Sequence, residues 1–359
     1  MKTTTSKQRV TVGLSGGVDS TAAALLLKEK GYEVIGVYID VTGEDSKGRG
    51  EALKVAEKLG IALSFADVSK EFSKVVIADF GGEYMKGRTP NPCVICNPLI
   101  KFKSLLNAAE EHGASFIATG HYANVIYDES EGCYFIKKAG NEKKDQSYML
   151  YRLGRDALSR LILPLGRFKT KDEVRGYVGE NCIGNADARD SQEICFLPDG
   201  VNYVDYLKSL NYSTGEGEFV DSDYKVIGRH KGIVNYTVGQ RKNLGMSFGR
   251  PMFVVKIDSE KNRVVLGNSE ELFSREVISK HNFFTKSGSG EMPEEYDRII
   301  VAAKARYASD VSEAVIKRID SDTVKTVFKK PQRAVTPGQS IVFYDGDKVI
   351  GGGIISKTL

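Results

Sequence analysis

The segment that most constrains the fold is the turn Leu14–Ser20, which has the sequence LSGGVDS. It follows the apolar run Val10–Leu14, which predicts a strand, and precedes residues 21–28, which predict a helix that ends before Gly31. A tight, glycine-containing turn between a strand and a helix exposes backbone N–H groups at the helix N-terminus, and this geometry binds phosphate. The sequence therefore predicts a phosphate-binding loop at the end of a buried strand.

The loop lacks the lysine of the motif G-x-x-x-x-G-K-[ST], which argues against an ordinary P-loop nucleotidase. The pattern SGGxDS resembles instead the pyrophosphate loop of the ATP pyrophosphatases. Members of that superfamily cleave ATP between its α and β phosphates and attach AMP to a carbonyl oxygen. The alternative is a purely structural turn in which an aspartate caps a helix.

The first half of the chain alternates between strand and helix patterns. Further strands are expected at 34–39, 61–65 and 115–119, and further helices at 51–59, 75–84 and 99–109, with a loop at 87–98. This alternation predicts an α/β domain with a doubly wound parallel sheet. Ligands bind at the carboxyl ends of the strands in such sheets, so the phosphate loop, the 87–98 loop and Gly120–Tyr122 are expected to share one cleft.

The pattern changes after about residue 200, where turn residues become frequent and helical periodicity is sparse. Val254–Ile257 and Arg263–Leu266 predict a β-hairpin, and short apolar runs between 299 and 355 predict a small antiparallel β-barrel. We therefore expect three domains: a catalytic domain at 1–205, a small central module at 206–280 and the barrel at 281–359.

Composition narrows the class of protein. The 359 residues exceed one typical core, and 41% hydrophobic with 27% charged residues is typical of a soluble globular protein. Neither a long apolar run nor an N-terminal signal pattern is present, so we expect a cytoplasmic protein with no membrane partner. The net charge of +4 is too small to establish nucleic-acid binding by itself.

The five cysteines of a cytosolic chain point to chemistry or metal binding before structural disulfides. Cys93 and Cys96 form a C-x-x-C pair, which suits a redox pair, metal or cluster ligands, or a catalytic nucleophile. Cys195 lies between an isoleucine and a phenylalanine, so packing is expected to tether it unless it is itself a buried structural thiol. Cys133 and Cys182 lie in no motif and are expected to be structural.

Several motifs occur together and in order along the chain. They are SGGVDS, TPNPCVICN, GHYA, KDQSY, DSQEICF, GRHKG, YTVGQRK, PQRAVTPGQ and FYDG. Their combination, from about residue 9 to residue 356, resembles the tRNA-specific 2-thiouridylase family. The resemblance implies an adenine nucleotide alpha hydrolase-like catalytic domain, and an enzyme that replaces the C2 oxygen of the wobble uridine of tRNA with sulfur.

The resemblance also implies roles for individual residues. Those that would hold ATP are Gly13, Leu14, Ser15, Gly16, Gly17, Val18, Asp19 and Ser20, with Ile39 near the adenine and Gly120 completing the site. Mg²⁺ would neutralise the departing pyrophosphate. Cys195 would carry sulfur as a persulfide received from a sulfur carrier protein. Cys96 would be the second catalytic cysteine, which either attacks the persulfide to release sulfide or resolves the transfer by forming a Cys96–Cys195 disulfide.

The implied contacts with the anticodon loop of tRNA are spread over the chain. They involve Asn91, Pro92, Cys93, His121, Lys144, Asp145, Gln146, Arg306, Tyr307 and Gln339. Position 93 departs from members of the family that have an aspartate there, which puts an acid or base role at this position in doubt. The substitution also creates three thiols, Cys93, Cys96 and Cys195, which suit an iron–sulfur cluster as an alternative to a metal-free persulfide route.

Two further interpretations stay open at this point. A synthetase that adenylates a small molecule would explain SGGVDS but leaves the positioned cysteines and the later modules unexplained. A non-catalytic RNA-binding protein would bind tRNA without consuming ATP.

Overall fold

The computed structural model describes residues 7–43, 47–181, 194–198 and 200–359. These residues divide into two compact units. The first unit holds the described residues within 1–73, 93–192 and 347–350, and the second holds those within 74–92, 193–346 and 351–359. Cys182 and the first four residues of the DSQEICF motif lie outside the described residues.

The first unit is built on a five-stranded sheet in the order β3-β2-β1-β4-β7, with parallel neighbours throughout. Its strands are β1 (Arg9–Gly13), β2 (Glu33–Asp40), β3 (Ala62–Asp67), β4 (Phe116–Ala118) and β7 (Leu161–Ile162). Val10 and Val12 of β1 pack into a buried cluster with Leu27 and Val55 from two helices on one face. Thr11 points to the other face, where its hydroxyl donates to the Leu105 carbonyl at 3.3 Å.

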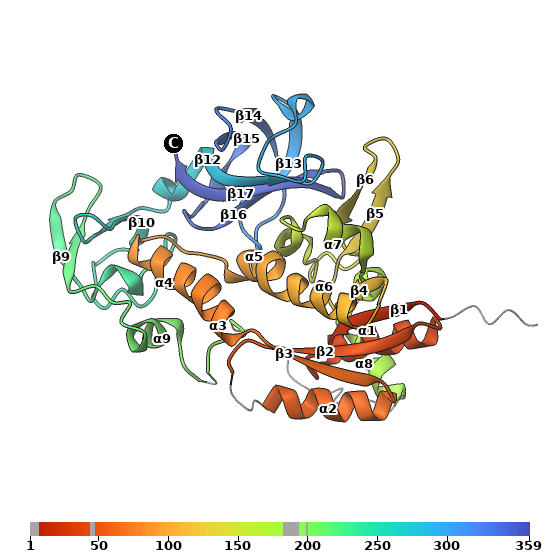
Figure 1. The fold of residues 1–359 in the computed structure, drawn as a ribbon. Helices are drawn as coiled ribbons and strands as arrows, with labels where there is room; N and C mark the ends of the chain where they lie inside the picture. Colours follow the sequence, from red (N-terminus) through yellow and green to blue (C-terminus); the bar gives the residue numbers. More distant parts are fainter. Residues whose placement is uncertain (1–6, 44–46, 182–193, 199) are drawn as a thin grey trace, which may run out of the picture. The chain divides into compact units, whose positions relative to one another are not determined.

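Helices cover both faces of this sheet, so the predicted doubly wound architecture is confirmed. Figure 1 shows α2 and α6 on opposite sides of the sheet. The α-helices are α1 (Val18–Glu29), α2 (Lys47–Leu59), α3 (Ser69–Phe72), α6 (Phe102–Glu111), α7 (Arg155–Arg160) and α8 (Lys171–Glu180). A β-hairpin of β5 (Asn124–Asp128) and β6 (Cys133–Lys137) and the 3₁₀ turns η3 (Ser147–Leu150) and η4 (Pro164–Arg167) complete the unit.

The prediction of a loop over 87–98 is wrong in its second half. The C-x-x-C motif lies in a helix, α5 (Pro92–Cys96), which continues through the π-helical turn η2 (Asn97–Lys101) into α6. Proline is favourable at the first position of a helix, because its missing N–H has no partner there in any case. Pro98 is interior and cannot donate to a carbonyl one turn earlier, so the ladder widens, and the Phe102 N–H donates to the Asn97 carbonyl.

The second unit contains a four-stranded sheet in the order β10-β11-β8-β9. Its strands are β8 (Gly217–Val220), β9 (Val226–His230), β10 (Phe253–Asp258) and β11 (Arg263–Gly267), and η5 (Ile233–Asn235) packs beside them. The antiparallel pairing of β10 with β11 confirms the predicted hairpin. Phe219, Val254 and Leu266 are fully buried at the centre of this module.

Apart from the start of the last strand at 348–350, the same unit contains the predicted antiparallel barrel. Its strands run in the order β12-β15-β14-β13-β16-β17 and close through a β12–β17 pairing. They are β12 (Phe273–Phe284), β13 (Ile300–Lys304), β14 (Ser312–Arg318), β15 (Val324–Arg333), β16 (Ser340–Asp345) and β17 (Lys348–Thr358), with η6 (Glu270–Leu272) and η7 (Glu294–Tyr296) between strands. The first barrel strand begins at Phe273, ahead of residue 281, where the sequence suggested the barrel to start.

Three helical segments complete the second unit. The expected helix over 75–84 is present as the π-helical turn η1 (Ser73–Ile77) and α4 (Ala78–Met85), and α9 (Tyr203–Ser209) packs against α4 through stacked rings of Tyr84 and Tyr203, 4.9 Å apart. Among the described residues, no helix is both long and apolar enough to cross a bilayer.

Candidate active site

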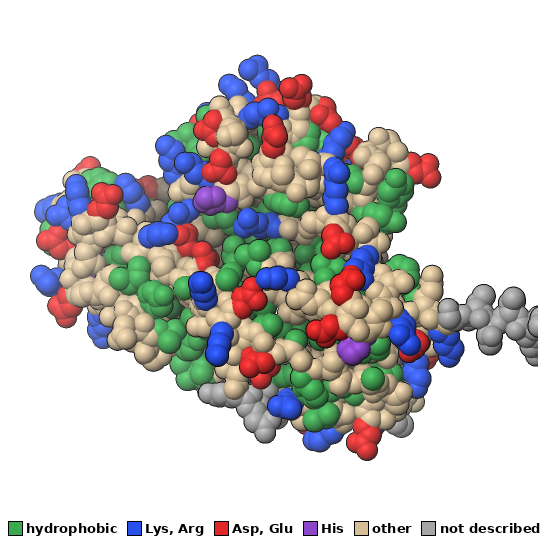
Figure 2. All heavy atoms as spheres, in the orientation of Figure 1, with side chains coloured by type: hydrophobic (Ala, Val, Ile, Leu, Met, Phe, Trp, Pro, Cys, Tyr) green, Lys and Arg blue, Asp and Glu red, His purple; other side chains and the backbone are tan. Residues whose placement is uncertain are grey.

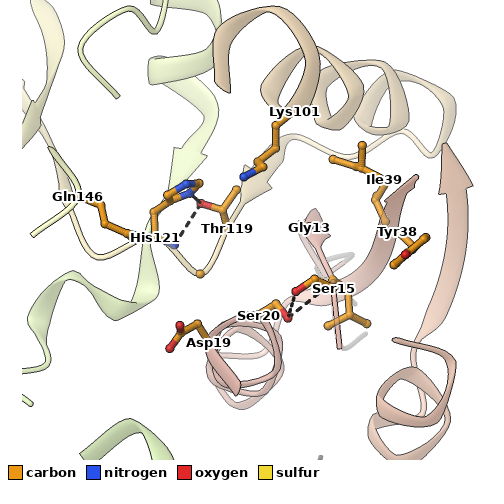
Figure 3. Close-up of a pocket in the computed structure, with 13 residues that line it drawn as sticks. Gly13, Ser15, Asp19, Ser20, Tyr38, Ile39, Lys101, Thr119, His121 and Gln146 are labelled. Atoms are coloured by element: carbon orange, nitrogen blue, oxygen red, sulfur yellow. Dashed lines mark hydrogen bonds between the residues drawn. The ribbon is translucent and has the colours of Figure 1, made fainter. Parts of the chain in front are cut away.

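A cavity of about 740 Å³, counted to its open mouth, lies at the carboxyl ends of β1, β2 and β4 in the first unit. The residues that line it are Gly13, Leu14, Ser15, Asp19, Ser20, Val37, Tyr38, Ile39, Lys101, Thr119, Gly120, His121 and Gln146 (Figure 3). The expected cleft at this edge of the parallel sheet is therefore confirmed for the phosphate loop and for Gly120 and His121, whereas no described residue of the 87–98 loop lines it.

The loop after β1 is held in shape by its own hydroxyl groups. The Ser20 hydroxyl donates to the Gly17 carbonyl at 2.9 Å and accepts from the Ser15 N–H at 3.2 Å. Gly17 is the N-cap of α1 and has no side chain to occupy the helix end. The first N–H groups of α1 have no intrahelical acceptor, and this end of a helix carries a partial positive charge. The loop therefore presents donors suited to phosphate oxygens.

Two glycines let the backbone segments around this loop approach closely. Gly16 has a φ of +80°, and a Cβ there would come within 2.6 Å of Glu51 at the start of α2. A Cβ on Gly120, in the loop after β4, would lie 2.7 Å from the Asp19 carbonyl carbon and 2.9 Å from the Ser20 nitrogen. Gly120 therefore packs directly on the first turn of α1.

We expect the Gly120→Ala substitution to weaken ATP binding by about tenfold or more, because the new methyl group would displace the phosphate-binding turn. Isothermal titration with ATP measures the effect. Gly176→Ala is the control, since Gly176 lies in α8 and a Cβ there meets no atom within 4 Å. Equal affinities of the two variants would contradict the steric role of Gly120.

Asp19 of the loop is paired with a lysine from a distant part of the sequence. The Lys171 ammonium group, in the first turn of α8, lies 2.6 Å and 2.5 Å from the two carboxylate oxygens of Asp19. The Tyr122 hydroxyl donates to the same carboxylate at 2.7 Å. The lysine side chain is only 14% exposed, so this pair is partly shielded from water. Sequence reasoning identified Asp19 and missed Lys171.

His121 lies beside the cavity with its ring ordered by two neighbours. Its Nδ1 is 2.7 Å from the Thr119 hydroxyl, and the ring stacks on Phe102 at 5.9 Å. Burial, and to a smaller degree the charge of Lys101, lowers the pKa of His121 to about 3. The imidazole is therefore neutral at physiological pH, and it can accept or donate a hydrogen bond without adding charge to the site.

The lowered pKa of His121 predicts that the stability of the fold depends on pH and decreases as the pH falls. Between the unfolded pKa of about 6.5 and the folded pKa, the unfolded chain binds more protons, so stability falls as the pH falls through this window. We expect acidification from pH 7 to pH 5 to cost the wild type about 1–2 kcal/mol more than His121→Asn. Urea unfolding at both pH values measures the difference, and parallel losses in the two proteins would contradict it.

The KDQ segment, Lys144–Gln146, contributes Gln146 to the cavity wall. The Gln146 side chain lines the cavity and accepts from the Tyr122 N–H at 2.9 Å. Asp145 is buried, and its carboxylate accepts from the Ala139 N–H at 2.9 Å and from the Ser147 hydroxyl at 2.7 Å. The aspartate thus shapes the backbone that presents Gln146.

The cysteines of the first unit differ in exposure. Cys93 is exposed and Cys96 is buried, both within α5, and Cys133 is buried in β6, as its structural interpretation requires. Neither Cys93 nor Cys96 lines the described cavity. The helix that carries them is anchored next to Cys96, because the Asn97 side-chain amide donates to the Met149 carbonyl at 2.9 Å.

Cys195 lies in the second unit, in an exposed turn, which removes the interpretation of a buried structural thiol. Its neighbour Phe196 is buried, with its ring 5.5 Å from Phe80 of α4 and 5.7 Å from Tyr206 of α9. The expected tethering by packing is thereby confirmed: the aromatic contacts fix the turn, and the thiol faces solvent.

The remaining predicted RNA-contact residues of the second unit lie near Thr89 and in the barrel. The Gln339 side-chain amide donates to the carbonyls of Thr89 and Pro90 at 2.8 Å and 3.3 Å, directly ahead of Asn91 and Pro92. Arg306 lies in the turn after β13, where its N–H donates to the Ser309 hydroxyl, and the Lys304 ammonium lies 5.5 Å from the Tyr307 ring. Figure 2 shows basic side chains interspersed with acidic ones over the barrel.

Comparison with known proteins places the chain in a family. Three family models match it in order: a tRNA methyl transferase HUP domain at residues 8–199, a tRNA methyl transferase PRC-barrel domain at 205–268 and an aminomethyltransferase beta-barrel domain at 282–355. Proteins named tRNA-specific 2-thiouridylase MnmA from Acetivibrio thermocellus and Clostridioides difficile are 45% and 43% identical over 98% of this chain and 99% of their own. A relative named MnmA 1 from Caldanaerobacter subterraneus is 48% identical over 97% of this chain and 98% of its own.

The chain belongs to the tRNA-specific 2-thiouridylase family. The resemblance seen in the sequence motifs is thereby confirmed. The family uses ATP, and the loop at Gly13–Ser20 lines a cavity with helix N–H donors suited to phosphate oxygens. Asp19 and the hydroxyls of Ser15 and Ser20 offer the hard oxygen donors that Mg²⁺ accepts when substrate phosphates supply its other ligands. The residues present therefore suit a nucleotide-bound Mg²⁺.

An iron–sulfur cluster is not shown by the described donor set. Among the residues that the structure describes, no three His, Cys, Asp or Glu side chains are grouped so that they could hold a metal ion.

The sequence analysis did not predict four of the residues that line the cavity, namely Val37, Tyr38, Lys101 and Thr119. Lys101 left a signal that could have found it. It lies four and seven residues before the buried Leu105 and Ala108, so it occupies the buried face of its helix. A cation on such a face is unusual and points to a binding site.

Proposed function

We propose that this chain is an ATP-dependent tRNA-uridine 2-sulfurtransferase that converts the wobble uridine of tRNA to 2-thiouridine. One observation carries the proposal: a single helical segment from Pro92 to Glu111 bears both cysteines of the C-x-x-C motif and contributes Lys101 to the ATP cavity. This continuity couples a thiol to the nucleotide site. The relatives named above are tRNA-specific 2-thiouridylases, and they match over nearly the whole chain.

The first step uses the cavity of the first unit. Uridine O2 attacks the α-phosphorus of ATP, the bond from that phosphorus to the bridging oxygen breaks, and pyrophosphate leaves with the electron pair. Uridine loses its N3 proton and becomes an O2-adenylate, which turns a poor leaving group into AMP. The N–H groups at the start of α1 hold the pyrophosphate oxygens, and bound Mg²⁺ would neutralise their charge.

The second step uses the cysteines. The terminal sulfur of a Cys195 persulfide attacks C2 and displaces AMP, and the Cys96 thiolate then attacks Cys195 Sγ. This releases 2-thiouridine and leaves a Cys96–Cys195 disulfide, which an external thiol reduces before the next turnover. Alternatively, Cys96 attacks the persulfide first, and the released sulfide attacks C2. Both routes require the two sulfur atoms to approach to about 2 Å.

The partners follow from this chemistry. The exposed Cys195 turn would accept sulfur from a persulfide-donating carrier protein, and the enzyme would act in the cytoplasm on the anticodon loop. Single-stranded loops suit base recognition, because a base can leave the stack only where pairing does not hold it. Asn91, Pro92 and Cys93 would meet the flipped base, and the other contacts would come from the KDQ segment, His121, the Arg306–Tyr307 turn and Gln339.

Single-turnover thiolation of unmodified tRNA with ATP and a persulfide donor tests the proposal. We expect one sulfur per tRNA, with AMP and pyrophosphate formed in equal amounts. Adenylation of a small molecule without sulfur incorporation would favour a synthetase, and tRNA binding without ATP consumption would favour a non-catalytic RNA-binding protein. Iron quantification after anaerobic purification decides the cluster alternative, since stoichiometric iron that is lost in Cys93→Ser would replace the metal-free route.

A further inference from the structure

Of the described residues that line the ATP cavity, Lys101 is the one with a lysine or arginine side chain. Figure 3 shows it entering from the helix on the side opposite Ser15 and Ser20, with its ammonium group directed into the cavity. It belongs neither to the phosphate loop nor to the C-x-x-C motif, so the function assigned to these two motifs does not explain it.

The packing of its helix fixes the position of Lys101. Leu105, one turn later on the same face, packs against Gly13 at the end of β1, where a Cβ would lie 3.8 Å from its methyl groups. Lys101 is the last residue of the π-helical turn that Pro98 enforces. The lysine therefore reaches the space just beyond the carboxyl end of β1, between the phosphate loop and His121.

The charge of Lys101 has no anionic partner from the described protein. No ion pair or hydrogen bond of its ammonium group occurs among the described residues, whereas Lys103, two residues later, pairs with Glu71 at 2.8 Å. Asp19 is the carboxylate that lines the same cavity, and Lys171 holds it. A partly buried ammonium group needs a counter-charge, and phosphate is the anion that this cavity admits.

The position within the cavity decides which phosphate this is. The N–H groups at the start of α1 suit the pyrophosphate end of ATP, and Ile39 and Tyr38 line the part expected to hold the adenine. The α-phosphate connects these two ends, and Figure 3 shows the Lys101 ammonium group across the cavity from Ser15 and Ser20, close to Thr119 and His121.

We propose that Lys101 is a further catalytic residue, which binds a non-bridging oxygen of the α-phosphate of ATP and of the adenylate formed from it. The inference rests on the proposed function and deepens it. Attack of uridine O2 on the α-phosphorus crowds negative charge around that atom while pyrophosphate departs with the bonding electrons. A fixed ammonium group lowers the energy of this arrangement, since it is already in place and needs no reorganisation. Lysine serves here as a point charge and transfers no proton.

Binding of ATP, AMP, inorganic pyrophosphate and adenosine to Lys101→Met, measured by isothermal titration, tests this. We expect the affinities for ATP and AMP to fall by about 10- to 100-fold, the loss of one charge-assisted contact. Adenosine and pyrophosphate, which lack the α-phosphate, should bind within about twofold of wild type. Lys103→Met is the matched control on the same helix and should change none of the four, because its side chain is 55% exposed and lies outside the cavity.

Each other pattern overturns the assignment. If the affinities for adenosine and AMP fell equally, Lys101 would contact the nucleoside or support the structure of the cavity wall. If the affinity for pyrophosphate fell and that for AMP did not, Lys101 would bind the β- or γ-phosphate. Unchanged affinities throughout would remove it from the site. Lys101→Arg keeps the charge and should retain AMP binding better than the methionine variant. None of these titrations uses tRNA, so they stand even if the thiolation assay of the wild type fails.

Discussion

Cys96→Ser and Cys195→Ser are each expected to reduce single-turnover tRNA thiolation by about a thousandfold or more, while ATP and tRNA affinities stay within about threefold of wild type. A hydroxyl group can neither carry a persulfide nor form the disulfide that releases the product, so no slower version of the same route remains. The reaction is followed by transfer of labelled sulfur from a persulfide donor to tRNA.

The two variants should fail at different stages. Cys195→Ser should not acquire a persulfide, because the exposed thiol of Cys195 is the proposed acceptor. Cys96→Ser should acquire one and keep that sulfur bound to Cys195, as the persulfide or as a disulfide to C2 of the tRNA. Cys93→Ser tests the third thiol, which lies one turn before Cys96 in the same helix and would contact the target base without carrying sulfur. In the metal-free route it should keep at least a third of the activity. Full thiolation by Cys96→Ser or Cys195→Ser would remove that cysteine from the mechanism.

The nucleotide site shows what the sequence can predict. Gly13–Ser20 combines local signals of one kind: an apolar strand, glycines that relax the backbone, and a helix with no competing cap. Each signal lies within one short window and agrees with its neighbours. The parallel sheet and the barrel were predictable for the same reason, because alternation and turn spacing are local properties of the chain.

The rest of the site depends on contacts that no local window contains. Pro98 suggested the start of a helix, yet Pro92 starts it, and the interior proline only widens one turn. Lys171 lies 152 residues from Asp19, and its motif-free position in α8 gave no indication that it meets the loop. Such pairs form because of how helices pack on the sheet, so sequence patterns and residue spacing could not predict them.

Asp19→Asn is expected to lower ATP-dependent AMP formation by roughly a hundredfold or more. Of the described residues that line the cavity, Asp19 is the one with a carboxylate, and the substitution removes it. The substitution also leaves the Lys171 ammonium group, 14% exposed, beside a neutral amide. We therefore expect a stability loss of about 1–2 kcal/mol in addition to the loss of activity. Pyrophosphate release in the presence of tRNA and urea unfolding measure the two effects separately.

The double variant Asp19→Asn/Lys171→Met separates structure from chemistry. Removing both partners of the ion pair leaves no uncompensated charge, so the double variant should recover stability relative to Asp19→Asn, and the two stability changes should be non-additive. Activity should stay low, since the oxygen donor suited to Mg²⁺ is still missing. If activity returned together with stability, Asp19 would act only by restraining Lys171, and the nucleotide-bound metal would have to be held without this carboxylate.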